Sequence, residues 1–78
     1  MKVSEAVSLR LNELIKQKDT TTYKVFKNSG LDRDNVYKLV NGKKNDFRIS
    51  TIIAISNVLD ISIQEFFNSP YFDKNLTD

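Results

Sequence analysis

Polar side chains that can form hydrogen bonds with base edges lie on one face of the segment 32–41. Residues three and four apart are neighbours on a helix. Four polar side chains therefore share this face: Arg33, Asp34, Tyr37 and Lys38. Arginine and lysine can bond guanine, and aspartate can accept from the cytosine amino group. Nearby Asn35 carries an amide, which favours adenine. A solvated helix face with a surface ion pair between Asp34 and Lys38 is the alternative that this pattern leaves open.

Groups suited to phosphate binding flank this segment. The start of a short helix at Thr22 and Tyr23 offers free backbone N–H groups at the positive end of a helix dipole. A polar loop on the other side can hold phosphates through Lys43, Lys44 and Arg48. The net charge is only +2, but residues 16–48 contain nine basic and four acidic side chains. Neutralising phosphates requires such a basic region, although a solvated charged face explains the charge equally well.

Apolar residues recur at helical spacing and predict an all-α fold of five helices. The expected helices span about 4–18, 22–29, 32–41, 50–59 and 62–68. Each has a predicted N-cap residue, in this order: Ser4, Thr21, Asp32, Ser50 and Ser62. The fourth helix is apolar nearly all round, which predicts that it forms the buried centre. We expect one domain over residues 1–68 and a C-terminal tail over residues 69–78.

The second and third helices form the unit that positions the polar face. Both are short, and the turn between them contains Gly30, at the position where a left-handed residue ends a helix. Leu31 before the cap and Val36 within the helix form a hydrophobic staple. Two short helices joined in this way are typical of a helix-turn-helix unit, whose second helix enters the major groove of DNA.

Several function classes are disfavoured by what the chain lacks. It has no cysteine and no histidine, which removes disulfides, thiolate metal sites and the commonest general base. No spacing of a nucleophile and a base and no glycine-rich phosphate loop stands out, so we expect neither enzyme activity nor a cofactor or metal. No long apolar run indicates a signal peptide or a membrane span, and a cytoplasmic location is expected.

The stretch from Leu11 to Phe67 resembles the phage repressor and Cro type of helix-turn-helix domain, often called the XRE family. Leu14, Thr21, Val25, Ser29-Gly30-Leu31, Val36, Leu39 and Asn41-Gly42-Lys43 carry its first half. Ile49-Ser50-Thr51-Ile52-Ile53 and Leu59 through Phe67 carry its second half. The combination of Asn-Gly-Lys after the third helix with the later Leu-Asp-Ile-Ser and Glu-Phe-Phe is the most specific part.

This resemblance implies a compact five-helix domain like that of lambda repressor, which binds a palindromic operator as a dimer and does not catalyse a reaction. Carried over position by position, the base-reading residues are Arg33, Asp34 and Lys38. Asn35 and Tyr37 are implied to lie close to the DNA backbone or to a thymine methyl group. The residues implied to lie near phosphates are Asn41, Lys43 and Lys44.

Two hypotheses follow from these observations. The first is a sequence-specific regulator of transcription, a repressor, that binds double-stranded DNA as a homodimer. Its dimer surface is predicted in the C-terminal third, which has more aromatic side chains than a small core easily absorbs: Phe66, Phe67, Tyr71 and Phe72. The second is an antitoxin or adaptor module whose main partner is another protein, and the two roles can coexist.

Overall fold

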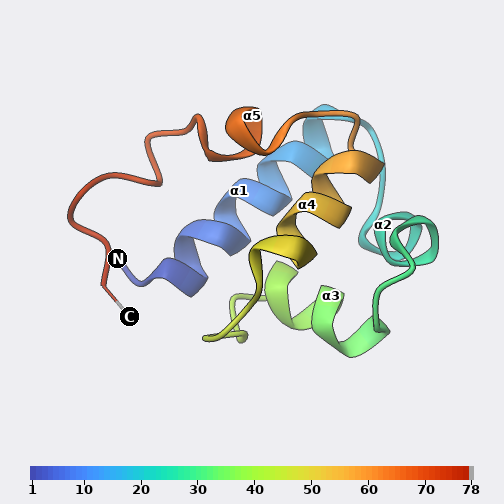
Figure 1. The fold of residues 1–78 in the computed structure, drawn as a ribbon, viewed down its shortest axis with the longest axis horizontal. Coiled ribbons are helices and arrows are strands. Elements are labelled where there is room, and N and C mark those ends of the chain that lie inside the picture. The colour runs from blue at the N-terminus through green and yellow to red at the C-terminus, as the bar shows by residue number, and fades with distance from the viewer. Residues whose placement is uncertain (78) are drawn as a thin grey trace.

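The computed structural model describes residues 1–77 and confirms the all-α prediction (Figure 1). The helices are α1 Val3–Gln17, α2 Thr22–Ser29, α3 Arg33–Val40, α4 Ile49–Val58 and α5 Ile63–Phe67. In the described part of the chain, strand-type pairing is limited to an isolated bridge between Lys2 and Thr77. None of the helices in that part has the length and apolar character needed to cross a membrane.

All five helices contribute to a single hydrophobic core. Helix α3 packs against α1 and α2, and α4 packs against α2 and α5. The buried apolar side chains of the core are Val7, Leu11, Leu14, Val25, Val36, Leu39, Val40, Ile52, Ile55, Leu59 and Phe66. Because Val25 anchors α2 and Val36, Leu39 and Val40 anchor α3 in this core, the relative orientation of the two helices is determined by packing as well as by the short turn between them.

Three of the five predicted N-caps are confirmed. The side chains of Thr21, Asp32 and Ser62 each accept a hydrogen bond from the backbone N–H three residues later, at 3.1, 3.3 and 3.0 Å. Gly30 ends α2 with a φ of 73°, as its position predicted. These helix ends depend on bonds between residues close in sequence, and such bonds satisfy backbone groups that the helix itself leaves unpaired.

The predicted caps Ser4 and Ser50 are wrong. Helix α1 begins at Val3, with Ser4 buried inside it, and the backbone N–H of Val3 donates to the carbonyl of Thr77 at 2.8 Å. The start of α1 is therefore satisfied by the far end of the chain. Helix α4 begins at Ile49 after Arg48, and no side chain caps it.

Helix α4 is not buried on all sides, contrary to the prediction. Ile52 and Ile55 point into the core, whereas Ile49 and Ile53 are 56% and 41% exposed. A domain of this size has too few other elements to cover every face of one helix. The result is an uncharged, partly apolar stripe along α4 that faces solvent.

The residues after α5 return along the molecule to the N-terminus (Figure 1), where the N–H of Thr77 donates to the carbonyl of Met1 at 3.0 Å. Phe72 from this segment lies with its ring centroid 4.9 Å from that of Phe67 and 6.1 Å from that of Phe66. Residue 78 of the predicted tail 69–78 lies outside the described residues.

The aromatic cluster removes one residue, Phe66, from the predicted dimer surface. Phe66 is 0% exposed and belongs to the core of its own chain, so it cannot meet a second copy. Phe67 and Phe72 are partly buried against the same core, and Tyr71 is half-buried. The segment after α5 packs beside these rings and covers them in part, which the sequence pattern did not indicate. The dimer surface predicted for Phe67, Tyr71 and Phe72 stays a prediction.

Arg10 is a structural residue that sequence reasoning missed. Its side chain is 7% exposed, and its Nε and Nη2 donate to the carbonyls of Phe66 and Glu65 at 2.7 and 2.6 Å. Its Nη1 forms an ion pair with Glu13 at 2.6 Å. Arg10 thus ties α1 to the C-terminal end of α5, where the carbonyl of Glu65 also accepts from the backbone N–H of Asn68.

Ser56 gives a prediction about stability. Its hydroxyl oxygen is buried and forms no hydrogen bond with any of the described residues. We expect Ser56→Ala to stabilise the domain by about 1 kcal/mol, because alanine fits the site and removes the cost of an unpaired buried hydroxyl. Thermal unfolding followed by circular dichroism measures this. A lower midpoint than that of the unchanged chain would show that the hydroxyl has a partner in solution.

Candidate nucleic-acid interface

The turn between α2 and α3 is held by local hydrogen bonds. The hydroxyl of Ser29 donates to the carbonyl of Phe26 at 3.1 Å and accepts from the N–H of Leu31 at 3.2 Å. Gly30 adopts a positive φ between them, a conformation that costs glycine little. Because Val25 and Val36 are also fully buried, α3 is supported on α2 both by the turn and by the core.

The outer face of α3 carries the polar side chains that the sequence indicated. Arg33, Asp34 and Lys38 are exposed, while Asn35 and Tyr37 are half-buried beside the core stripe. The ion pair considered for Asp34 and Lys38 is not formed in the structure over residues 1–77, where the salt bridge found joins Arg10 to Glu13. Arg33, Asp34 and Lys38 are therefore free to meet a ligand from solvent.

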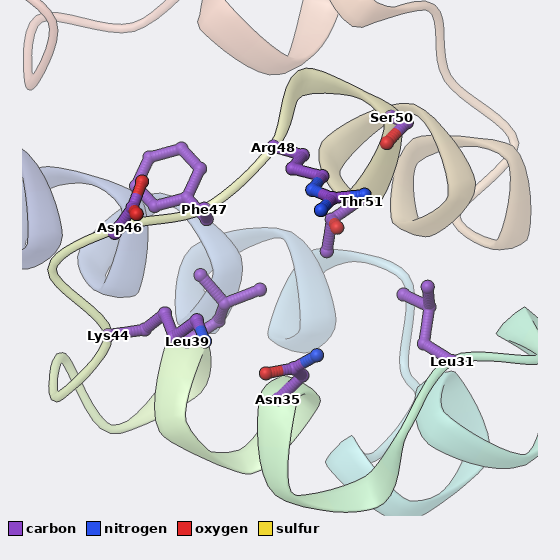
Figure 2. Close-up of a pocket in the computed structure, with 9 residues that line it drawn as sticks. All are labelled: Leu31, Asn35, Leu39, Lys44, Asp46, Phe47, Arg48, Ser50 and Thr51. Carbon is purple, nitrogen blue, oxygen red and sulfur yellow. The ribbon is translucent and has the colours of Figure 1, made fainter.

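Between α3 and the start of α4 lies an open groove of about 570 Å³ (Figure 2). The groove is lined by Leu31, Asn35, Leu39, Lys44, Asp46, Phe47, Arg48, Ser50 and Thr51. Figure 2 shows Asn35 pointing into it from α3, with Arg48 beside Thr51 on the α4 side. The fold thus brings one predicted base-reading residue together with two predicted phosphate-binding residues.

The remaining predicted phosphate-binding residues lie outside this groove. Asn41 and Lys43 are exposed just after α3, and Thr22 and Tyr23 form the first turn of α2. Thr22 is half-buried and Tyr23 is exposed. The side chain of Thr21 accepts from the N–H of Lys24. The positive end of the α2 helix dipole lies at this first turn, at the surface.

Ser50 and Thr51 are groove residues that sequence reasoning missed. Ser50 was predicted to cap α4, but it lies in the first turn with its side chain at the groove rather than on the helix backbone. The uncapped start of α4 and the two hydroxyl groups add hydrogen-bonding capacity beside Arg48. The only signal in the sequence was a pair of adjacent hydroxyl residues at a helix start. A serine at such a position is equally typical of an N-cap residue.

Comparison with known proteins agrees with this geometry. A family model described as a Cro/C1-type HTH DNA-binding domain matches residues 10–70. A solved structure titled "Crystal structure of the prophage Lp1 protein 11" is similar, with a TM-score of 0.80 and 35% sequence identity. The match covers 94% of this chain and 99% of that one. A search of the curated proteins gives no match. The chain therefore belongs to the family of Cro/C1-type helix-turn-helix DNA-binding domains.

Proposed function

We propose that this DNA-binding protein is a sequence-specific transcriptional repressor that reads the major groove with α3. The observation that carries the proposal is the contrast between the two faces of α3. Val36, Leu39 and Val40 anchor it in the core, while Arg33 and Lys38 remain exposed at its outer face. A helix whose inner face is anchored in the core and whose outer face is polar can present the same side chains to base edges each time it binds.

Each exposed side chain of α3 has a role in this proposal. Arg33 and Lys38 bond guanine, and Asp34 accepts from a cytosine amino group. Asn35 and Tyr37, which are less exposed, lie close to the DNA backbone or to a thymine methyl group. Phosphates are bound by the start of α2 and by the loop before α4, and the residues involved are Thr22, Tyr23, Asn41, Lys43, Lys44 and Arg48.

Selection of bound sites from random duplex DNA tests the proposal directly. We expect enrichment of a short motif that appears twice as an inverted repeat, with centres about one helical turn apart. A folded protein that enriches no sequence, even at low ionic strength, would overturn it. Failure of duplex DNA to compete with a bound protein partner would instead favour the adaptor function.

A phosphate contact is distinguished from a base contact by its salt dependence. We expect Lys43→Ala to weaken binding about equally for specific and nonspecific duplexes, and to reduce the slope of log affinity against log salt by about one. Lys74→Ala is the matched control, because Lys74 is an exposed lysine in the segment after α5. Equal slopes for the two variants would remove Lys43 from the interface.

We also propose that the protein acts as a homodimer on a palindromic operator. Of the apolar surface left exposed, Ile49 and Ile53 on α4 continue directly from Arg48 at the candidate interface. Helix α4 contains no charged residue, so two copies related by a twofold axis would meet there without like-charge repulsion. Two half-exposed side chains fall far short of the roughly 1,200–2,000 Å² of a stable interface, so we expect pairing on DNA rather than in free solution.

Substitution of Ile53 tests this pairing. We expect Ile53→Lys to abolish cooperative binding to the two halves of a selected site while leaving binding to one half intact, because two lysines would then face each other. Leu9→Lys is the matched control, since Leu9 on α1 is 42% exposed and Ile53 is 41% exposed. Gel-shift titrations on full and half sites measure the effect. Unchanged cooperativity in Ile53→Lys would exclude this face of α4.

A further inference from the structure

Arg33 and Tyr37 form a cation–π contact on the outer face of α3. The guanidinium carbon of Arg33 lies 4.7 Å from the centroid of the Tyr37 ring, one helical turn further along. Over residues 1–77, the structure contains no hydrogen bond or salt bridge from the Arg33 side chain. A cation–π contact uses none of the five guanidinium N–H groups as donors to an oxygen or nitrogen acceptor, so these groups are available to a ligand.

The two partners of this contact differ in how firmly the fold holds them. Tyr37 is half-buried, and its neighbours Val36 and Val40, the residue before it and the one three residues further on, are buried in the core. Arg33 is the first residue of α3 and is exposed. The ring is therefore the fixed partner, and the long, flexible arginine is the one whose orientation the contact restricts.

We propose that Tyr37 is a positioning residue that holds the plane of the Arg33 guanidinium for bonding to one guanine. This inference rests on the proposed entry of α3 into the major groove. Bonding of both guanine acceptors requires the planar fork of arginine to approach edge-on, so a preset plane reduces the ordering needed on binding. Tyr37 thereby determines specificity through Arg33, not through a base contact of its own hydroxyl group.

Two variants of the full chain separate these roles. Tyr37→Phe keeps an aromatic ring under the guanidinium, whereas Tyr37→Leu keeps an apolar side chain of moderate size without a ring. We expect Tyr37→Leu to lower the preference for guanine about two- to fivefold at the position that Arg33 reads, which is the effect of losing an exposed cation–π contact. Tyr37→Phe should retain the guanine preference of the unchanged chain at that position. Loss of a contact from Tyr37 to the DNA backbone or to a thymine methyl group would instead change the overall affinity or the preference at a different position.

The measurement is competition between a selected duplex and duplexes that carry each other base at that position, with circular dichroism confirming that both variants are folded. A second readout is independent of DNA. The Arg33 side-chain protons should show upfield ring-current shifts in the unchanged chain and in Tyr37→Phe, and these shifts should be lost in Tyr37→Leu.

Several results would overturn the inference. If Tyr37→Leu keeps the full guanine preference, the contact does not position Arg33. If Tyr37→Phe loses as much preference as Tyr37→Leu, the hydroxyl group is the important feature and the ring is not. If the unchanged chain shows no base preference, the proposed function itself fails and the inference fails with it. The first two results are distinct from this one, because both require a base preference in the unchanged chain.

Discussion

Replacing Arg10 by methionine is expected to destabilise the domain by about 1–3 kcal/mol, because the change leaves the buried carbonyl of Phe66 without its charged donor. Arg10 donates to the carbonyls of Phe66 and Glu65 and pairs with Glu13. Methionine fills much of the space but offers no N–H group. For a domain of 78 residues, which has limited stability to lose, an effect of this size is a large part of the total free energy of unfolding.

Urea unfolding followed by circular dichroism measures this loss. Arg33→Met is the matched control, since it makes the same chemical change at an exposed site and should alter stability by no more than about 1 kcal/mol, which allows for loss of the contact with Tyr37. Arg10→Lys keeps the charge without the planar fork, and we expect it to fall between the unchanged chain and Arg10→Met. Equal unfolding midpoints for Arg10→Met and Arg33→Met would show that the bonds to α5 contribute little.

Removal of the Arg33 side chain is expected to have the largest effect on DNA recognition. We expect Arg33→Ala to cost about 1–3 kcal/mol on the preferred site and to relax base preference at one position of each half-site. The physical reason is that the two hydrogen-bond acceptors on the guanine edge lose the pair of arginine donors that distinguishes guanine from the other bases. Arg33 is exposed and lies outside the core, so the substitution should leave the fold intact.

The measurement is a titration with the selected duplex and with a nonspecific duplex of the same length. A base contact predicts that the specific affinity falls more than the nonspecific one, whereas a phosphate contact predicts equal losses. Lys43→Ala provides the comparison, because Lys43 is assigned to phosphate. Unchanged affinity and unchanged base preference for Arg33→Ala would show that α3 is not the recognition helix.

Helix α4 and the residues after α5 show where sequence patterns were insufficient. The apolar character of α4 indicated burial on every side. The sequence pattern does not show how many other helices can cover α4, and Ile49 and Ile53 remain exposed. The aromatic residues near the C-terminus suggested a surface for a second copy. In the structure Phe66, Phe67 and Phe72 contact one another, and Phe66 is fully buried.

Ser4, Ser50 and Arg10 illustrate the same limitation for polar groups. A serine before an apolar run is a good capping candidate, but the start of α1 is bonded to Thr77 at the other end of the chain. Arg10 looked like one charged residue of an amphipathic helix, yet its partners lie 55 and 56 positions away. No local pattern contains that information.

The sequence by itself determined the class of fold, the helix-turn-helix unit and the outward face of α3. These features depend on interactions within a few residues: the caps at Thr21, Asp32 and Ser62, the left-handed Gly30, and a helical period that separates Val36 and Leu39 from Arg33. Only the tertiary structure decided the groove beside Arg48, the exposed stripe of α4 and the burial of Arg10 and Phe66. The physical reason is that burial and hydrogen-bond partners at these sites come from segments distant in the chain, which become neighbours only when the whole core packs.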